Sequence, residues 1–499
     1  MATALYDVFS PTAMADVDRQ TIQQGTPGTL LMQRAGSALA RLCRSLRGRG
    51  SARILCGPGN NGGDGWIAAR VLLDAGWDID VCSLVDPATL SGDAAWAARG
   101  WQKAVTLLED APAQLPRTDI FIDAAFGGGL NRPISEQVAA GIQAAHAAAD
   151  TSIAVDIPSG IDGATGEDRA GVYSGAEPLV FDHCITFGAR RFGHVLLPGK
   201  AAYTKLWIVD IGLSQSALAE RSGGKLNTPI DTSTNLALTP KPHVHKYMRG
   251  HVGVVCGAPG KSGAGKLAAL AALKAGAGLV TLLHRGAIDL LGMPASVMHA
   301  SWPDPAEFQS FLNQRKISTV VVGPGLGLDP GARALCDAAL SAAGTAVFDA
   351  DALTIIAAEN WLHRLTQHAI ITPHEGEFRR LLPSLDGPKI RRFTNALKTT
   401  PAVICLKGAD TLIGRGGASK PIINDNAPPN LAVAGSGDML AGLIAAVLGP
   451  GTDPLHAAQI GVYVHALTGQ LAGTLGHTED FLRCVPAAIA QYKADLARL

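Results

Sequence analysis

Short runs of β-branched residues alternate with Ala- and Leu-rich stretches along almost the whole chain, and this alternation constrains the fold most strongly. It favours a mostly parallel sheet with helices on both faces, and hence an α/β protein. The strands expected in the first half are "ARILCG", "DIDVCSL", "DIFIDAAF", "SIAVDIPS", "CITFG" and "LWIVDIG". Those expected in the second half are "HVGVVCGA", "GLVTLL", "STVVVGPG", "TAVFDADAL", "AIITP" and "AVICLKG".

A polar segment interrupts this alternation in the middle of the chain. It contains a Gly-Gly pair and prolines, and it shows no sustained apolar period. The two halves are not repeats of one another, and 499 residues are enough for two or three domains. We therefore predict two different domains, 1–213 and 236–499, joined by a linker at 214–235.

The bulk composition disfavours several classes of partner and location. Lys plus Arg and Asp plus Glu both number 42, so we expect neither nucleic acid nor an anionic membrane as a partner. The eight cysteines are scattered without a Cys-x-x-Cys pair, which indicates free thiols in a cytoplasmic protein rather than a zinc site. The first 20 residues lack the charged leader and apolar core of a secretory signal.

The apolar stretch 431–449 is the best candidate for a membrane span, but it contains Asp438. A carboxylate at the centre of a span costs at least about 2.5 kcal/mol. The stretch also holds several glycines, so we expect a buried helix that follows a tight turn.

Three loops of the first half carry polar side chains at strand ends. "GPGNNGGDG" lies between a strand and a helix whose positive end favours phosphate, and Asn60, Asn61 and Asp64 add side-chain oxygens there. Two later strands end at Asp123 and Asp156. Ligands of open parallel sheets bind beyond the carboxyl ends of the strands, so these loops are expected to converge, and their oxygens suit a hard cation. The alternative is that each Asp caps the turn that follows it.

The motifs "AMADVDRQTIQQGTPGTLLMQRAG", "GPGNNGGDG", "DAAFGGGLNRPI" and "DIPSGIDGATG" resemble the epimerase domain of the NAD(P)HX repair enzymes. NAD(P)HX is hydrated NADH or NADPH, and the family interconverts its R and S epimers at the hydrated carbon of the nicotinamide ring. The resemblance implies a Rossmann-like, three-layer αβα domain with a potassium ion on Asn61, Asp123 and Ser159. The substrate contacts that it implies are Asn60, Asn61, Gly62, Gly63, Asp64, Gly127, Gly128, Gly129, Leu130, Asn131, Arg132, Pro133 and Asp156.

The second half contains a pattern that is typical of phosphate-binding loops. Residues 260–266 fit G-x-x-x-x-G-K between an expected strand and an expected helix. The next residue is Leu267, so the hydroxyl that would bind the magnesium of a nucleotide is missing. A glycine-rich substrate loop is the favoured interpretation, and a true phosphate-binding loop is the alternative.

A stronger signal is "AGSGDMLAGLIAAV", where Gly435, Ser436 and Gly437 precede an apolar helix and Asp438 lies in its first turn. Loop amides and a helix N-terminus attract phosphate oxygens. A carboxylate beside a bound phosphate can take the proton from an attacking hydroxyl, while the amides stabilise the developing charge. Alternatively, Asp438 only complements the helix dipole.

This segment, with "HKYMRGHVGVVCG", "AALKAGAGLVTL", "VVGPGLG", "FDADAL", "TPHEGEFRRL" and "LKGADTLI", resembles the ADP/ATP-dependent NAD(P)HX dehydratases of ribokinase-like αβα fold. The resemblance implies that ADP phosphorylates the substrate hydroxyl, with Asp438 as the base and with magnesium supported through Glu377. Loss of phosphate then restores NAD(P)H and leaves AMP. The implied substrate contacts are Ala264, Gly327, His374 and Asp438, and the implied nucleotide contacts are Lys407, Gly408, Ala409, Asp410, Thr411 and Gly437.

Both resemblances together imply a bifunctional enzyme that epimerises NADHX and NADPHX and dehydrates the S form with ADP. We expect a cytoplasmic homo-oligomer. The alternative is a ribokinase-like small-molecule kinase with an accessory nucleotide-binding domain. One departure lies before the glycine turn, where the family has Gly-Asn-Pro-Gly-Met-Ala: this chain keeps Asn430 and Ala432 but has only Leu431 between them.

Overall fold

The computed structural model divides the chain into two compact units, Met1–Lys225 and Leu226–Leu499. The boundary lies inside the segment 214–235 that we expected to be a linker. The structure describes residues 6–112, 114–257, 260–286, 292–342, 344–417 and 419–499.

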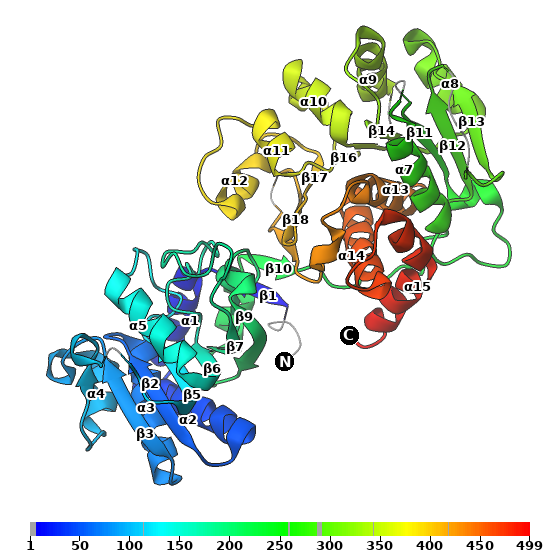
Figure 1. Cartoon of the computed structure of the whole chain (residues 1–499). Helices are drawn as coiled ribbons and strands as arrows, with labels where there is room; N and C mark the ends of the chain where they lie inside the picture. Colours follow the sequence, from blue (N-terminus) through cyan, green and yellow to red (C-terminus); the bar gives the residue numbers. More distant parts are fainter. Residues whose placement is uncertain (1–5, 113, 258–259, 287–291, 343, 418) are drawn as a thin grey trace. The chain divides into compact units, whose positions relative to one another are not determined.

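A seven-stranded sheet forms the centre of the N-terminal unit (Figure 1). All its neighbouring strands are parallel, in the order β4-β3-β2-β5-β6-β7-β9, as the strand and helix alternation predicts. The strands are β2 (Ser51–Cys56), β3 (Asp78–Ser83), β4 (Thr106–Leu107), β5 (Thr118–Ala124), β6 (Ala149–Val155), β7 (Phe181–Phe187) and β9 (Tyr203–Val209). Because the strands are parallel, the loops after β2, β5 and β6 open at the same edge of the sheet.

Helices cover both faces of this sheet, which gives the expected three layers. On one face α3 packs between α2 and α4, and α5 covers β5 and β6 on the other face (Figure 1). The helices are α1 (Pro11–Gln23), α2 (Gly28–Arg47), α3 (Asn60–Asp74), α4 (Gly92–Arg99), α5 (Glu136–Ala147) and α6 (Gln215–Arg221). Helix α1 begins with Pro11, and its N-cap Ser10 accepts a hydrogen bond from the Ala13 amide at 3.1 Å.

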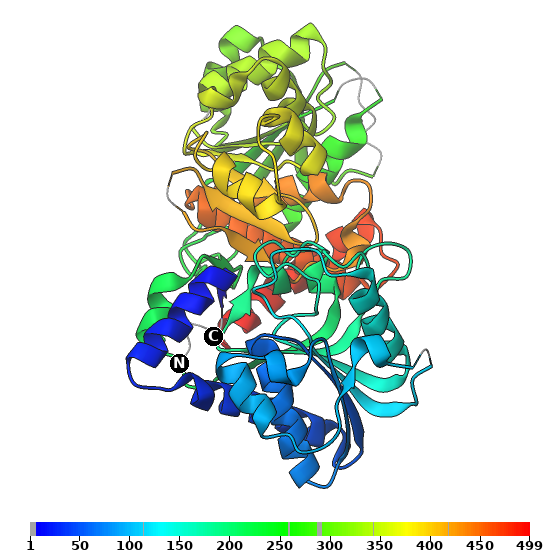
Figure 2. The same ribbon diagram turned by 90° about the vertical axis from the view of Figure 1, so that its left-hand side faces the viewer.

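The segment 214–235 is structured over its first part, although its sequence shows no sustained apolar period. Helix α6 lies beside α1, from the opposite end of the unit's sequence (Figure 2). Its residues Ala217 and Leu218 are buried in the N-terminal core. The short strands β10 (Gly224–Leu226) and β8 (Arg190–Arg191) flank β1 (Asp7–Phe9). The two apolar residues of α6 are too few to produce a recognisable helical period.

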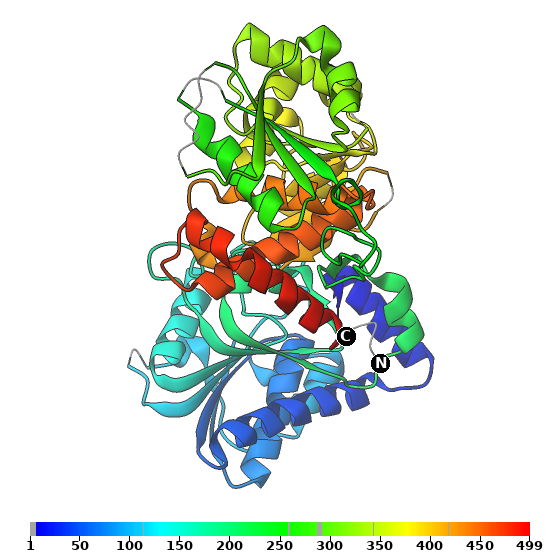
Figure 3. The same ribbon diagram turned by 90° about the vertical axis from the view of Figure 1, so that its right-hand side faces the viewer.

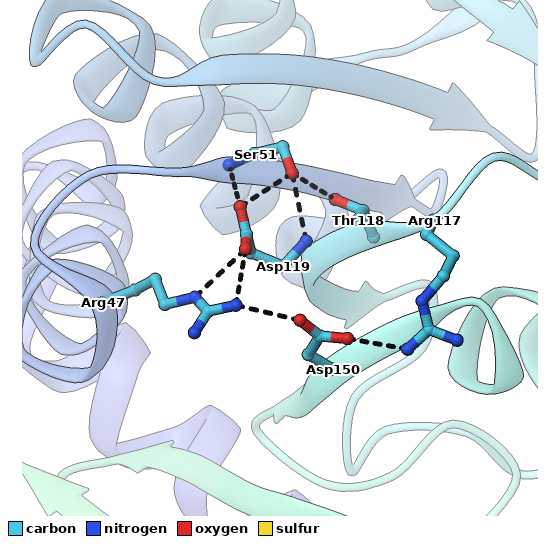
Figure 4. A network of polar contacts seen from close by, with 6 residues as sticks. All are labelled: Arg47, Ser51, Arg117, Thr118, Asp119 and Asp150. Carbon is cyan, nitrogen blue, oxygen red and sulfur yellow. Dashed lines mark hydrogen bonds and ion pairs between the residues drawn. The ribbon is translucent and has the colours of Figure 1, made fainter.

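The amino ends of the same strands carry a closed network of ion pairs (Figure 4). Arg47 contacts Asp119 at 2.6 Å and Asp150 at 2.9 Å, and Arg117 contacts Asp150 at 2.7 Å. The second oxygen of Asp119 accepts a hydrogen bond from the Ser51 amide at 2.8 Å. Every carboxylate in this network is therefore compensated, which identifies it as structural.

The C-terminal unit has a larger sheet whose first seven strands are parallel, in the order β13-β12-β11-β14-β15-β16-β17. Strands β18 and β19 extend it in antiparallel pairing. The strands are β11 (His251–Val255), β12 (Leu279–His284), β13 (Val297–Ser301), β14 (Thr319–Val322), β15 (Ala346–Phe348), β16 (Ala369–Ile371), β17 (Val403–Leu406), β18 (Thr411–Arg415) and β19 (Ile422–Asn424).

Two groups of helices sandwich this sheet. Helices α7, α13, α14 and α15 pack together on one face, and α8 to α11 follow one another on the other (Figures 1 and 3). The helices are α7 (Ser262–Lys274), α8 (Phe308–Arg315), α9 (Pro330–Ala342), α10 (Ala350–Ala358), α11 (Glu375–Leu381), α12 (Lys389–Ala396), α13 (Ser436–Leu448), α14 (Pro454–Ala472) and α15 (Thr478–Leu496).

Helix α13 is the apolar stretch that contains Asp438, and the prediction of a buried helix after a tight turn is confirmed. It begins at Ser436, and most of its residues are buried in the C-terminal core. A methyl group on Gly442 would lie 2.1 Å from the carbonyl oxygen of Ala268, so only glycine allows α13 to approach α7 this closely. No helix in the described part of the chain is long and apolar enough to cross a membrane. All eight cysteines are free thiols.

Candidate active sites

The glycine-rich turn after β2 forms a tight entry to α3. A methyl group on Gly62 would lie 1.9 Å from the carbonyl oxygen of Gly57, so a larger residue cannot replace it without moving the backbone. Among the described residues the amides of Asn61 and Gly62 have no hydrogen-bond acceptor, as expected for a helix N-terminus. The turn can therefore bind an anionic group such as phosphate.

Asp123 and Ser159 form a buried pair between the loops that follow β5 and β6. One oxygen of Asp123 accepts a hydrogen bond from the Ser159 hydroxyl at 2.7 Å, and the other from the Ser159 amide at 2.8 Å. Burial raises the pKa of Asp123 to about 6, although these hydrogen bonds lower it. The side-chain amide of Asn61 is also buried, and neither of its polar atoms has a partner within the part of the chain that the structure describes.

Asp156 holds the neighbouring loop in place from a strained backbone position. Its φ of 62° lies in the left-handed region, which is costly for residues other than glycine and is found most often at functional sites. Its carboxylate accepts hydrogen bonds from the Gly128 amide at 2.8 Å and the Thr186 hydroxyl at 2.9 Å, and Arg191 lies 3.1 Å away. Burial raises the pKa of Asp156, but the Arg191 guanidinium and the hydrogen bonds from Gly128 and Thr186, with His194, together lower it by more, so the net shift is downward. Asp156 is thus an anion.

A cavity of about 630 Å³ opens beside these groups, which is a typical size for a small-molecule site. The predicted residues that line it are Asn60, Asn61, Asp64, Gly127, Gly128, Gly129, Leu130, Asn131, Arg132 and Asp156. The other predicted residues, Gly62, Gly63 and Pro133, shape its loops, and Asp123 and Ser159 lie behind its wall. The three polar loops therefore surround one cavity.

Lys407 is the charged centre of a second site, at the carboxyl end of β17. Its ammonium group lies 2.6 Å from the Asp349 carboxylate and 3.9 Å from Glu377. Burial lowers the pKa of Lys407, but the carboxylates of Asp349 and Glu377 outweigh this effect. The net shift of the pKa is upward, and the ammonium group stays charged. Asp349 is only 1% exposed, so this ion pair has little contact with solvent.

The N-terminus of α13 lies directly beside this ammonium group. Gly435 takes a φ of 84° at the N-cap, and a methyl group on Gly437 would lie 3.2 Å from Lys407 Nζ. Within the described residues the amides of Gly437 and Asp438 have no acceptor. Burial and, as the second cause, the negative charge of Asp349 raise the pKa of Asp438 to about 6. Two free amides, a cation and a carboxylate of raised pKa thus meet at one helix end.

Two further predicted substrate residues, Gly327 and His374, follow β14 and β16, which flank β15 in the sheet. Gly327 donates its amide to Asp351 at 2.8 Å, and Lys261 approaches the same carboxylate at 3.5 Å. His374 is the N-cap of α11: its Nδ1 accepts a hydrogen bond from the Gly376 amide at 3.0 Å, and its ring stays exposed. The predicted residue Ala264 lies in the first turn of α7.

The predicted nucleotide loop connects β17 with β18. Thr411 donates its hydroxyl to the Gly408 carbonyl at 2.7 Å, which closes the turn around Ala409. The carboxylate of Asp410 contacts Lys389 at 2.5 Å and is buried. The side chain of Asp410 therefore braces the loop, which leaves the backbone around Gly408 as the part suited to a ligand.

The G-x-x-x-x-G-K pattern does not form a phosphate-binding loop. Helix α7 begins at Ser262, so Gly263, Gly265 and Lys266 belong to the helix. A methyl group on Gly265 would lie 2.2 Å from Sγ of Cys256, the residue after β11, so this glycine serves close packing at the end of that strand. The residues 258–259 of the preceding turn lie outside the described residues.

Comparison with known proteins covers both units. Residues 28–193 match the family described as YjeF-related protein N-terminus, and residues 252–479 match NAD(P)H-hydrate dehydratase. The bifunctional NAD(P)H-hydrate repair enzyme Nnr of Thermofilum pendens is 34% identical over 483 residues, covering 91% of this chain and 90% of that protein. The chain belongs to the bifunctional NAD(P)H-hydrate repair enzymes.

Other repair enzymes of this name are similarly related. That of Escherichia coli is 31% identical over 461 residues, with 89% of this chain and 86% of that protein covered. A crystal structure of the ADP/ATP-dependent NAD(P)H-hydrate dehydratase of Bacillus subtilis superimposes on 50% of this chain and 93% of its own, at 24% identity and a TM-score of 0.42. The predicted union of an epimerase and a dehydratase in one chain is confirmed at the level of the family.

The structure of this repair enzyme also shows polar residues that the sequence motifs did not indicate. In the C-terminal unit, His465 of α14 lies 3.0 Å from the Ser436 hydroxyl at the start of α13. Burial lowers the pKa of His465 to about 4, so its imidazole is neutral at neutral pH. In the N-terminal unit, Asp18 of α1 and Arg191 line the cavity. His465 and Asp18 lie inside helices, away from a glycine turn or a strand end, and Arg191 ends β8, a two-residue strand that is not among the expected strands.

Proposed function

We propose that the C-terminal site transfers the terminal phosphoryl group of ADP to the hydroxyl of S-NAD(P)HX, with Asp438 as the general base. The observation that carries this proposal is the placement of Asp438 beside the free amides of Gly437 and Asp438 and the ammonium of Lys407. A base works best when its pKa lies near the working pH, and about 6 meets this condition.

Each group has a distinct task in this reaction. The carboxylate of Asp438 takes the proton of the substrate hydroxyl as its oxygen attacks the phosphoryl group. The two amides stabilise the charge that develops on that group, and Lys407 adds a fixed positive charge. The phosphate then leaves with the electron pair of the carbon–oxygen bond, and the neighbouring ring carbon loses a proton whose bonding pair forms the ring double bond. The products are NAD(P)H, AMP and free phosphate.

Magnesium would accompany the phosphates of the nucleotide rather than occupy a cage of protein ligands. The described residues contain no cluster of three His, Cys, Asp or Glu side chains that could hold a metal ion. The carboxylate of Asp349 is bound to Lys407, and that of Glu377 accepts the His374 amide at 2.8 Å. The carboxylates of Asp349 and Glu377 are therefore already engaged by groups of the protein.

The N-terminal cavity is the proposed site of epimerisation. Its free helix amides suit the pyrophosphate of the hydrated nucleotide, and its size suits the nicotinamide end. Asn61, Asp123 and Ser159 fit a potassium ion, because the buried amide of Asn61 lacks a partner and all three offer oxygen. The ion would neutralise the Asp123 carboxylate when bound.

The test uses a mixture of R- and S-NADHX, which regains absorbance at the wavelength of NADH when it is dehydrated. With ADP, the wild-type enzyme should convert the whole mixture and release one phosphate for each NADH. Asp438→Asn should lose dehydration by a factor of about 10²–10⁴ while it still interconverts the epimers.

Two outcomes would contradict the proposal. A stable phosphorylated product without free phosphate would indicate a small-molecule kinase instead. Conversion that stops at the S half of the mixture would show that the N-terminal cavity does not epimerise. Asp453→Asn is a suitable control, because Asp453 caps α14 and pairs with Arg415 away from the residues placed in the reaction.

A further inference from the structure

One acid of the N-terminal cavity, Asp64, is uncompensated. It is 9% exposed and lines the cavity, and the described residues give its carboxyl group neither a hydrogen bond nor an ion pair. Asp156, by contrast, is held by Arg191, and Asp123 is held by Ser159. A buried polar group without a partner is rare in proteins and indicates a ligand or a chemical role.

Asp18 lines the same cavity from α1, whereas Asp64 comes from α3. The carboxyl group of Asp18 forms neither an ion pair nor a hydrogen bond with another described residue. Asp16, two residues earlier on α1, behaves differently: it pairs with Arg19 at 2.9 Å and does not line the cavity. Asp18 is exposed to solvent and Asp16 is partly buried, so what distinguishes them is that only Asp18 borders the cavity.

The charges around this cavity do not balance. Four carboxyl groups line it, those of Asp18, Asp64, Asp93 and Asp156, but only two guanidinium groups do. Of these, Arg132 is exposed, and Arg191 is buried and lies against Asp156. Burial, followed by Asp156 and Asp18, raises the pKa of Asp64 well above its usual range. Burial also raises the pKa of Asp18, although Arg191 lowers it. Both carboxyl groups therefore bind a proton more readily than an ordinary Asp side chain, as an acid and base pair requires.

We infer that Asp64 and Asp18 are the acid and the base that move the hydroxyl group of NAD(P)HX from one face of its ring to the other. This inference rests on the proposed function, because it requires the hydrated nicotinamide ring to lie in the N-terminal cavity. Two carboxyl groups from different helices suit an inversion, since the leaving and entering oxygens lie on opposite faces of the ring.

The reaction balances without an oxidant or a reductant. One carboxyl group donates its proton to the hydroxyl oxygen, the carbon–oxygen bond breaks, and its electron pair leaves with the water formed. The lone pair of the adjacent ring nitrogen forms a carbon–nitrogen double bond. A water molecule then adds from the opposite face, the double-bond pair returns to nitrogen, and the other carboxylate takes the released proton. The reverse inversion exchanges the two roles.

The experiment measures inversion of pure R-NADHX by chiral chromatography for the wild type, Asp18→Asn, Asp64→Asn and the control Asp16→Asn. Both cavity variants should lose kcat for inversion by a factor of about 10²–10⁴, the usual contribution of acid–base catalysis, with little change in KM. Asp16→Asn should invert like the wild type. All four proteins should dehydrate pure S-NADHX at one rate, which verifies folding and concentration.

A second measurement follows the oxygen atom. In ¹⁸O-labelled water each inverted molecule should gain one ¹⁸O, because the original carbon–oxygen bond breaks. Inverted product that keeps its ¹⁶O would overturn the inference, as would wild-type rates in Asp18→Asn or Asp64→Asn, or an equal loss in Asp16→Asn. A wild-type enzyme that does not invert R-NADHX at all would instead refute the proposed function, and the inference with it.

Discussion

Replacing Asp438 by Asn should make the C-terminal unit more stable while it removes dehydration. The pKa of Asp438 rises from its ordinary 3.8 to about 6 because the protein buries this carboxyl group, next to Asp349. Each tenfold change in an ionisation constant is worth about 1.4 kcal/mol, so the charged carboxylate costs the folded state about 3 kcal/mol at neutral pH. Asparagine has the same shape and no charge, so it avoids this cost.

The sign of the effect gives the experiment its pH dependence. A raised folded-state pKa means that the contribution of Asp438 to stability is fully present below pH 3.8 and is lost as the pH rises through about 6. The wild type and Asp438→Asn should therefore unfold at similar temperatures near pH 4. At pH 7.5 the variant's C-terminal unit should unfold about 6–12 °C higher, since 1 kcal/mol shifts the midpoint of a domain of this size by about 2–4 °C.

Calorimetry should follow the transition of the C-terminal unit, because two units need not unfold together. Epimerisation by the same samples provides the control, because Asp438 lies in the other unit. Dehydration by the wild type should fall as the pH drops through about 6, where the base gains its proton. If Asp438→Asn is inactive but no more stable than the wild type at pH 7.5, the charged carboxylate of Asp438 does not destabilise the folded state, and this outcome would refute the argument.

Three other predictions concern residues around the two sites. Lys407→Met should destabilise the C-terminal unit by about 3–5 kcal/mol in chemical denaturation, because it leaves the buried Asp349 charge unpaired, and Lys407→Met with Asp349→Leu should recover part of this loss. Potassium should raise the melting temperature of the wild type relative to sodium, and Asn61→Ala should abolish this rise. His465→Leu should lower kcat for dehydration about tenfold by freeing Ser436, whereas His465→Gln should retain most of it, with epimerisation unchanged in both.

The sequence predicts most of the parallel strands because each is a short buried run with its own local pattern. It does not predict β4, β13 or the antiparallel strands β18 and β19. The same logic predicts polar loops at the carboxyl ends, and the structure brings Asn61, Asp64 and Asp156 to one cavity. The structure also places Asp18 and Arg191 at that cavity, through contacts between elements that are far apart in the sequence. Such positions depend on how α1 packs against the sheet, which no local period specifies.

The shortened segment before the glycine turn shows how a local change can be absorbed by distant elements. Asn430 donates its side-chain amide to the carbonyl of Gly469, at 2.8 Å, near the end of α14. Thr478, the first residue of α15, donates its hydroxyl to the carbonyl of Ala434 at 2.7 Å. The segment is therefore tied at both ends by the C-terminal helices.

These two ties fix the residues on either side of the point where Leu431 replaces the longer run. The turn at Gly435 follows directly after the second tie, and α13 with Asp438 follows the turn. Since His465 of α14 also contacts Ser436, helices α14 and α15 together hold the anion-binding end of α13 at three points. The position of Asp438 thus depends on the last 46 residues of the chain, and Thr478→Val should lower kcat for dehydration while epimerisation stays unchanged. Unchanged dehydration in Thr478→Val would show that the turn keeps its place without α15.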